Sequence, residues 1–433
     1  MQILDNILGI IMGGGRGSRL YPLTRDRAKP AVPIAGKYRL IDIPISNCIN
    51  SGIHHIAVLT QFNSVSLHRH ITQTYNFDAF HRGWVQLWAA EQTIGSESWY
   101  QGTADAVRKQ LFEIRSARAD YVLILAGDHL YQMDYEDMAR FHWDNGADIT
   151  VAVQPASTED ASRFGILKRS DEGLITDFVE KPKDPKVLKK FISRDDPERP
   201  YLASMGNYFF KTDVLLDLLN STTDDDFGGE VIPKAIHTHK VCGFDFDGYW
   251  EDIGTIRSFY EVNLKLASPD SPFNFNDPTK RIYTRARFLP STKVDGATLE
   301  DVMISEGCLI GKAEIENAVI GLRSQIGDGA VIRNTVLMGA DYYDNPDDLA
   351  KGQGIPLGIG KNSVIDGALI DKNARIGEGV VIKPFPPDVE IDHDDWVVRD
   401  GIVVIPKRAV IHPGTVIAPD KAVSDVPSSG VAQ

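Results

Sequence analysis

A glycine-rich loop, GGGRGSRL at residues 13–20, directly follows an apolar run. Backbone N–H groups without side chains around them can surround phosphate oxygens, and Arg19 can add charge-assisted hydrogen bonds. The loop lacks the Gly-Lys-Ser/Thr ending of a P-loop. Ser18 or Leu20 stands where a dinucleotide-binding fingerprint requires its last glycine. Taken alone, the loop therefore fits phosphate binding or a plain tight turn.

A run of cations follows the loop, with Arg25, Arg27 and Lys29 within ten residues of Arg19. The chain as a whole has a formal net charge of −14. Cations concentrated beside a glycine loop in an acidic chain indicate a polyphosphate site, although a solvated basic surface is the alternative. Prolines stiffen the segment, so Lys29 is the cation that we expect to point inward.

Two aspartates are candidate metal ligands. Asp128 ends the apolar run YVLILAG at 121–127, and Asp252 lies among aromatic residues in GYWEDIGT. Ligands of open α/β sheets bind just beyond the carboxyl ends of strands. Mg²⁺ needs only one or two carboxylates when phosphate oxygens and water complete its shell. The pair therefore predicts a Mg²⁺ site, and a helix cap or loop position is the alternative for each residue.

Glu180 and Lys181 stand side by side in FVEKP at a strand end. Lys181 could bind a monophosphate as a point charge, and Glu180 could accept a hydrogen bond from a sugar hydroxyl. An ordinary surface ion pair is the alternative.

The elements that must position these residues are those of an α/β sheet with crossover helices. Short β-branched runs at residues 7–12, 56–60, 121–127 and 148–153 alternate with longer amphipathic stretches. One helix can be read in detail: Thr103 is its expected N-cap, and Val107, Leu111 and Ile114 share one face.

The last third of the chain is a repeat. A six-residue period is the mark of a parallel β-helix, whose flat faces each take one hexapeptide. We therefore expect a first domain over 1–265, a linker rich in Pro, Ser, Asn and Asp over 266–292, and a β-helix over 293–433, with residues 341–358 as a loop. The aliphatic residues of the repeat are Ile304, Ile310, Ile320, Ile326, Ile332, Met338, Ile359, Ile365, Ile370, Ile376, Ile382, Ile405, Ile411 and Ile417.

Composition excludes several classes of protein. With 433 residues, 46 Lys and Arg, and 60 Asp and Glu, the chain fits two or three globular domains and is a poor candidate for nucleic-acid or membrane-surface binding. Its three cysteines lie far apart, which suggests neither a disulfide framework nor a zinc site. No apolar run approaches the ~18 residues of a membrane span. We expect a cytoplasmic protein.

Long motifs give the chain a resemblance to the sugar nucleotidyltransferases, and within them to the ADP-glucose pyrophosphorylase (glucose-1-phosphate adenylyltransferase) group. The resemblance implies a Rossmann-like nucleotidyltransferase domain with a mixed, mostly parallel sheet, followed by a left-handed β-helix of hexapeptide repeats, in a homotetramer. The motifs are GGGRGSRLYPLTRDRAKPAVP at 13–33, YRLIDIPISNCINSGI at 38–53, LTQFNS at 59–64, WYQGTADAV at 99–107, LAGDHLYQMDY at 125–135, FVEKP at 178–182, SMGNYFF at 204–210, DFGGEVIP at 226–233 and YWEDIGT at 249–255.

The resemblance also assigns residues. It implies Arg19, Lys29 and Asp128 as catalytic residues and Asp128 and Asp252 as ligands of Mg²⁺. Its ATP-binding residues are Gly13, Gly14, Gly15, Arg19, Lys29, Gln61, Trp99, Tyr100, Gly102 and Thr103. Its glucose 1-phosphate-binding residues are Tyr100, Gly165, Glu180, Lys181, Ser204 and Asp226.

The implied reaction joins ATP and α-D-glucose 1-phosphate into ADP-glucose and pyrophosphate, which supplies glycogen or starch synthesis. The attacking phosphate oxygen is already an anion, so no general base is needed. The reaction needs in-line alignment and neutralised charge: Mg²⁺, Arg19 and Lys29 act on the leaving pyrophosphate, and Lys181 acts on the nucleophile.

Regulation is part of the resemblance, since the family responds to sugar- or triose-phosphate effectors. Lys37 matches one family lysine linked to activation, and Lys372 and Lys407 match two others. Both sets are present, so the effector stays open. Asn207 stands where many relatives have an aliphatic residue, which leaves fine sugar selectivity open.

Three rival interpretations remain. A relative could use UTP, dTTP or GTP. A hexapeptide acyltransferase would need a catalytic histidine facing a cleft between coils, and only His393 and His412 lie in the repeat. A non-enzymatic scaffold would bind ligand without turnover.

Overall fold

The chain forms two compact units in the computed structural model, which describes residues 4–15, 17–78, 83–90, 100–345, 347 and 354–419. Each unit is drawn from three chain segments. The sheet unit comprises Met1–Gly15, Ile41–Glu251 and Phe275–Tyr283. The β-helix unit comprises Arg16–Leu40, Asp252–Asn274 and Thr284–Gln433.

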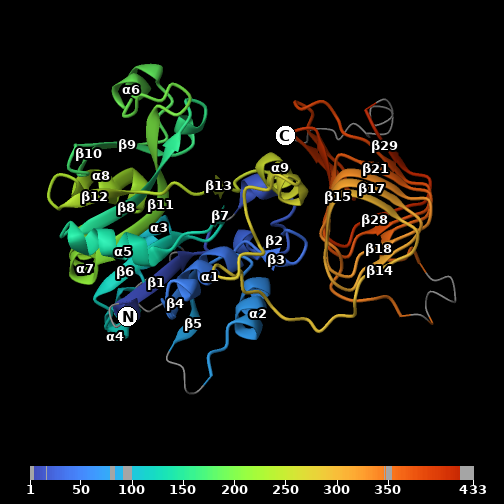
Figure 1. Ribbon diagram of the computed structural model, residues 1–433, viewed down its shortest axis with the longest axis horizontal. Helices are drawn as coiled ribbons and strands as arrows, with labels where there is room; N and C mark the ends of the chain where they lie inside the picture. Colours follow the sequence, from blue (N-terminus) through green and yellow to red (C-terminus); the bar gives the residue numbers. More distant parts are fainter. Residues whose placement is uncertain are drawn as a thin grey trace, which may run out of the picture. The chain divides into compact units, whose positions relative to one another are not determined.

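The sheet unit is built on a nine-stranded mixed sheet (Figure 1). Strand β1 lies between β4 and β6 and is parallel to both, and β11 is antiparallel to β6, β8 and β9. Burial on both faces explains the unbroken apolar runs of the central strands. The strands are β1 (Ile7–Met12), β4 (His55–Thr60), β5 (Trp84–Ala89), β6 (Tyr121–Ala126), β8 (Ile149–Ala156), β9 (Gly165–Arg169), β10 (Ile175–Glu180), β11 (Tyr201–Lys211) and β12 (Val241–Asp245).

Short helices cover this sheet, and α5 packs on β8, β11 and β12 while α7 packs on β6 and β11. A separate two-stranded sheet pairs β7 (His129–Tyr131), which follows β6 in the chain, with β13 (Trp250–Asp252). The sheet is thus the α/β arrangement that the alternating sequence pattern predicts. The helices of this unit are α1 (Asp42–Asn50), α2 (Val65–Thr74), α3 (Thr103–Arg108), α4 (Leu111–Ala117), α5 (Tyr135–Asp144), α6 (Pro185–Lys190), α7 (Thr212–Ser221) and α8 (Ile232–Ala235).

The helix expected after residue 102 differs from the prediction in two respects. It is two helices, α3 and α4, and the N-cap of α3 is Gly102 and not Thr103. Val107, Leu111 and Ile114 are buried together as predicted. The hydroxyl of Thr103 cannot cap the helix because it is engaged elsewhere, as described below.

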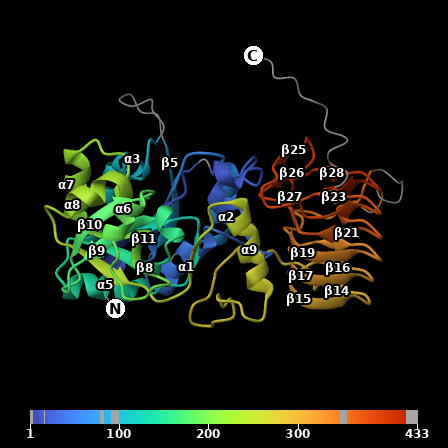
Figure 2. The ribbon, with the colours of Figure 1, turned by 90° about the horizontal axis from the view of Figure 1, so that it is seen from above.

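The β-helix unit stacks mostly parallel strands into coils with three flat faces (Figures 1 and 2), and only its strands within residues 391–405 pair antiparallel among those described. One face is a six-stranded sheet of two-residue strands: β14 (Lys293–Val294), β16 (Leu309–Ile310), β18 (Gln325–Ile326), β20 (Gly358–Ile359), β23 (Arg375–Ile376) and β28 (Val410–Ile411). The other two faces form a bent ten-stranded sheet: β15 (Thr298–Ile304), β17 (Glu314–Ile320), β19 (Val331–Leu337), β21 (Val364–Asp366), β22 (Ala368–Ile370), β24 (Val381–Ile382), β25 (Ile391–Asp392), β26 (Val397–Arg399), β27 (Ile402–Ile405) and β29 (Val416–Ile417).

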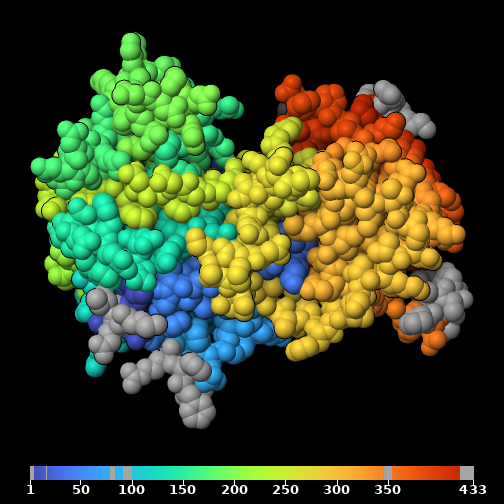
Figure 3. Space-filling view, viewed as in Figure 1, coloured from blue at the N-terminus to red at the C-terminus, as the bar shows by residue number. Residues whose placement is uncertain are grey.

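The coil interior confirms the six-residue repeat. The isoleucines that the repeat predicts, from Ile310 to Ile417, are buried there, and Ile304 packs against them. The prediction of Met338 is one residue too late: Leu337 takes the interior position, in register with Ile320 and Ile370, and the Met338 sulfur faces Arg27. At the corner where the long strands bend, Asn317 and Asn334 have positive φ, and the Asn317 Nδ2 donates to the Asn334 Oδ1 at 2.8 Å. Asparagine tolerates this backbone conformation, so one ladder of side chains both turns and links the coils. The stacked coils present a continuous surface (Figure 3).

Helix α9 (Ile256–Ala267) and the segment 16–40 complete the β-helix unit. Helix α9 packs on β15, β17 and β19. Within 16–40 lie the short elements η2 (Ser18–Leu20), η3 (Lys29–Ala31), β2 (Pro33–Ile34) and β3 (Tyr38–Arg39). The backbone oxygen of Gly36 accepts from the Leu322 N–H at 3.2 Å, so this segment runs along one corner of the coils. Residues 268–292 hold neither helix nor strand.

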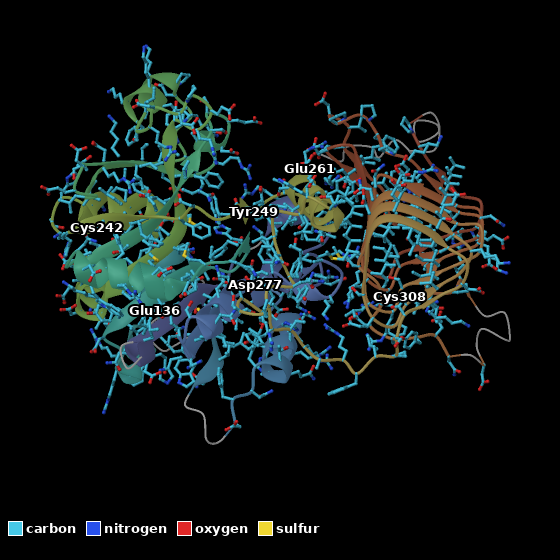
Figure 4. All side chains as sticks on the ribbon, viewed as in Figure 1. Glu136, Cys242, Tyr249, Glu261, Asp277 and Cys308 are labelled. Carbon is cyan, nitrogen blue, oxygen red and sulfur yellow. The ribbon has the colours of Figure 1, made fainter. Side chains whose placement is uncertain are left out.

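All three cysteines have free, buried thiols, and Figure 4 labels Cys242 and Cys308. Among the described helices, none combines the length and apolar character needed to cross a membrane.

Candidate active site

Three residues of the predicted sugar-phosphate set lie near one phenol, that of Tyr208 on β11, and a fourth, Gly165, adjoins one of them. The Ser204 side chain hydrogen-bonds the phenol, and the Glu180 and Asp226 carboxylates lie close enough to influence its ionisation. A Cβ on Gly165 would lie 2.7 Å from the Glu180 Oε2, so only glycine leaves room there. The structure therefore brings Gly165, Glu180, Ser204 and Asp226 together in the sheet unit.

Tyr208 is a member of this cluster that the sequence motifs did not single out. Burial, and then the negative charges of Glu180 and Asp226, raise the pKa of its phenol far above the usual value. The phenol therefore stays neutral and can donate as well as accept. The sequence signal that could have found Tyr208 is its spacing from Ser204, because residues four apart on a strand lie on the same face of the sheet. A register shift between these two residues, where Gly206 has φ +71°, makes that spacing a weaker guide.

Thr103 joins helix α3 to the same cluster. Its Oγ1 donates to the Asp226 Oδ2 at 3.0 Å and accepts from the Phe227 N–H at 3.0 Å. A Cβ on Gly102 would lie 2.2 Å from the backbone oxygen of Asp225. Gly102 and Thr103 are thus fixed against the loop that ends in Asp226, which in turn accepts from the Gly229 N–H at 2.8 Å.

Tyr100 and Gln61 form a second group, beside the glycine loop. The Tyr100 N–H donates to the Gln61 Oε1 at 3.0 Å, and a Cβ on Gly14 would lie 3.7 Å from the Tyr100 ring. Gly13 is pinned to the neighbouring strand, because its N–H donates to the Leu59 oxygen at 2.8 Å. Gly14 thus adjoins the tyrosine ring, and a Cβ on Gly15 would have nothing within 4 Å, so these two glycines leave open backbone and Gly13 does not. Trp99 lies outside the described residues.

Asp128 follows β6 directly, as expected for a ligand at a strand end. The Trp250 Nε1–H donates to the His129 Nδ1 at 3.2 Å, so the proton of a neutral His129 must be on Nε2, which lies 3.6 Å from the Asp128 Oδ1. The Asp128 side chain keeps part of its surface open. A partly open carboxylate suits the oxygen preference of Mg²⁺, so this residue fits the implied ion.

Arg19, Lys29 and Asp252 gather in the β-helix unit. The Lys29 Nζ lies 3.9 Å from the Asp252 Oδ1. A Cβ on Gly254 would lie 3.3 Å from the Asp252 Oδ2 and 3.6 Å from the Arg19 Nη2, so these two groups flank Gly254. Two cations beside one carboxylate can bind phosphate oxygens and still leave an oxygen ligand for a cation.

Lys181 projects beside Glu180. Its side chain is 59% exposed, and its Nζ lies 2.7 Å from the Glu180 Oε1. The backbone has φ +45°, and its N–H donates to the Phe164 oxygen at 3.0 Å. An exposed ammonium next to the buried cluster is free of the desolvation cost that a buried charge carries, so it can meet a dianionic phosphate.

The three predicted effector lysines fall into two places. The Lys372 and Lys407 Nζ atoms lie 2.5 Å and 3.5 Å from the two oxygens of Asp341, whereas the Lys37 Nζ lies 2.6 Å from the Glu306 Oε1 at the first coil. Burial alone would raise the pKa of Asp341, but the two lysines hold it well below its usual value. Burial lowers the pKa of Lys372 to about 8. Lys37 is thus not part of the Lys372 cluster.

Both the N-terminal and the C-terminal part of the chain match known protein families. Residues 8–269 match the family described as nucleotidyl transferase, and residues 287–416 match the GLGC left-handed parallel β-helix domain. The first match covers more than half of the chain. The second identifies the coil as left-handed and as the type found with this class of transferase domain.

Proposed function

The chain belongs to the nucleotidyl transferase family, and on that premise we propose that it transfers the adenylyl group of ATP to α-D-glucose 1-phosphate, with release of pyrophosphate. A sugar-phosphate adenylyltransferase fits the combination of the transferase domain with a GLGC-type β-helix. The finer assignment to glucose 1-phosphate, and to supplying ADP-glucose for glycogen or starch synthesis, is our proposal.

The hydrogen-bonded cluster around Tyr208 is the observation that supports it most. A hexose phosphate offers several hydroxyls and one dianion. The cluster offers acceptors in Glu180 and Asp226, a hydroxyl in Ser204, and an exposed ammonium in Lys181. Carboxylates that accept from sugar hydroxyls next to one cation form a complementary site for such a molecule.

The chemistry assigned to these residues is positioning and charge neutralisation. Lys181 holds the phosphate of the sugar, whose oxygen attacks the α-phosphorus of ATP without a general base. Arg19 and Lys29 stabilise the charge that develops on the leaving pyrophosphate. The open backbone of Gly14 and Gly15 lets phosphate oxygens approach their N–H groups. The Gly13 N–H is already bonded to Leu59, so Gly13 contributes by holding the start of the loop against strand β4.

Mg²⁺ is the cofactor that we propose, with Asp128 and Asp252 as its ligands. When bound, the ion supplies charge neutralisation for the phosphates. The His129 Nε2 lies 3.6 Å from the Asp128 Oδ1, so His129 adjoins the carboxylate that would hold the ion. Gln61, Trp99, Tyr100, Gly102 and Thr103 remain the residues proposed to hold adenine and ribose.

Regulation by a sugar- or triose-phosphate effector, and assembly into a homotetramer, complete the proposal. Lys372 and Lys407 already converge on an anionic group, the Asp341 carboxylate. This supports a phosphorylated effector there. Lys37 is a separate effector candidate.

Product analysis tests the proposed reaction. Purified full-length protein with ATP, α-D-glucose 1-phosphate and Mg²⁺ should form ADP-glucose and pyrophosphate in equal amounts, and omission of the sugar phosphate should abolish both. Replacement of ATP by UTP, dTTP or GTP should strongly reduce turnover. Faster turnover with any of these nucleotides, or pyrophosphate without a nucleotide sugar, would contradict the assignment.

A further inference from the structure

Arg27, in the cationic run of the glycine-loop segment, is buried in an ion pair with a distant part of the chain. Its Nη2 lies 2.8 Å and 2.9 Å from the two oxygens of Asp371, and its Nη1 lies 3.9 Å from the Met338 sulfur. The two side chains are only 3% and 1% exposed. This cation is therefore not a phosphate ligand at a surface but a contact inside the β-helix unit.

Asp371 is itself held in place at the corner that follows strand β22. Its Oδ1 accepts from the Lys372 N–H at 2.5 Å, and the Asp371 N–H donates to the Ile405 oxygen of the next coil at 2.9 Å. A carboxylate fixed by the stacked coils is a rigid anchor. One guanidinium nitrogen contacts both oxygens of this carboxylate and the other faces the Met338 sulfur, so the planar group is restricted in direction as well as distance.

Lys29 stands two residues after Arg27 in the chain. It begins the short helix η3, its Cβ is within 3.1 Å of where a Cβ on Gly17 would lie, and its Nζ is 3.9 Å from the Asp252 Oδ1. Because two residues span less than about 7 Å of chain, a shift at Arg27 must move the backbone that carries Lys29.

We infer that Arg27 and Asp371 are a positioning pair: their buried ion pair fixes the segment that presents Lys29 beside Asp252. The role of Lys29 in catalysis rests on the proposed function, but the placement of its amine does not. The inference therefore has a readout that needs no turnover.

The experiment measures acylation of Lys29 by an amine-specific reagent, with peptide mass spectrometry and with the exposed Lys293 as internal reference. In Arg27→Gln and Asp371→Asn, reactivity of Lys29 relative to Lys293 should rise several-fold over the native protein. Arg27→Lys keeps the charge but loses the second guanidinium nitrogen, which faces Met338, so it should give an intermediate value. Circular dichroism and thermal melts identify the variants that remain folded.

Arg257 provides the matched control. It also pairs with a distant aspartate of the β-helix unit, Asp400, but its helix does not carry Lys29. Arg257→Gln should leave the relative reactivity of Lys29 unchanged.

In steady-state assays, Arg27→Gln should raise the KM for ATP about tenfold, equivalent to 1.4 kcal/mol, with little change in the KM for the sugar phosphate.

The outcomes separate this inference from the proposed function. Native protein without adenylyltransferase activity, but with raised Lys29 reactivity in the folded variants, would overturn the function and keep the positioning pair. Unchanged reactivity in folded Arg27→Lys and Arg27→Gln would overturn the pair whatever the activity. Loss of folding in both of these variants would also overturn it, since the contact would then be one that stabilises the whole unit.

Discussion

Lys372 and Asp341 form an ion pair in which each partner alters the ionisation of the other, with the lysine side chain 9% and the aspartate side chain 42% exposed. The Nζ lies 2.5 Å from the Asp341 Oδ1, and the Asn373 Nδ2 donates to the other carboxylate oxygen at 3.1 Å. Burial lowers the pKa of Lys372 to about 8, although the attraction of Asp341 opposes this change. The lysine therefore changes charge within an experimentally accessible range of pH.

The response to a phosphorylated effector should weaken as the pH rises through about 8. Below that pH Lys372 is an ammonium and attracts the effector; above it the amine is neutral. The apparent affinity of the effector, measured at pH 7 and pH 9, should fall in the native protein. Lys372→Arg keeps its charge over this range and should retain most of the affinity at pH 9. The same loss in both proteins would assign the effect to another group.

The Asp341 carboxylate should compete with an anionic effector for Lys372 and Lys407. Asp341→Asn removes this internal counter-ion, so inorganic pyrophosphate should bind more tightly at these lysines, by about fivefold for roughly 1 kcal/mol. Isothermal titration calorimetry measures the change. Asp344→Asn is the control, because that carboxylate pairs with Arg375 instead. Weaker binding in Asp341→Asn would show that the carboxylate organises the lysines and does not compete.

Loss of the Tyr208 hydroxyl should weaken sugar-phosphate binding without unfolding the protein. Tyr208→Phe keeps the ring that packs against Phe210 and Phe227 and removes only the group beside Ser204. One lost hydrogen bond of about 1 kcal/mol corresponds to a KM for glucose 1-phosphate that is about fivefold higher. The KM for ATP serves as the internal control. An equal increase in both constants would place the hydroxyl outside the sugar pocket.

The sequence predicts the β-helix far better than it predicts the contacts of the site. The six-residue period is a local pattern that recurs in each coil, so it predicts the buried positions of every coil in the same way. Ile332 and Ile376 are buried where the period places them. The Arg27 and Asp371 contact joins residues 344 positions apart, and no local pattern pairs them. Thr103 illustrates the same limit, since helix-capping rules apply to its own turn whereas its hydroxyl bonds Asp226.

Removal of the Lys181 charge should raise the KM for glucose 1-phosphate and leave the fold intact. The side chain is 59% exposed and its ion pair with Glu180 is at the surface, so Lys181→Ala should cost little in the free energy of unfolding. Asp128→Asn should instead abolish turnover in a folded protein. Steady-state kinetics with each substrate varied separately distinguishes the two. An effect of Lys181→Ala on ATP alone would contradict its assignment to the sugar phosphate.

Two glycines of the loop should respond differently to alanine. Gly17 has φ +64°, and a Cβ there would lie 2.9 Å from the Thr24 Cγ2 and 3.1 Å from the Lys29 Cβ, whereas a Cβ on Gly15 would have nothing within 4 Å. Backbone strain in the left-handed region costs about 1–2 kcal/mol, so Gly17→Ala should lower the free energy of unfolding by at least that amount. Gly15→Ala should melt like the native protein but bind ATP more weakly, because its methyl group would lie where phosphate oxygens approach the backbone. Thermal melts together with ATP titrations test both, and native ATP affinity in Gly15→Ala would remove that residue from the phosphate site.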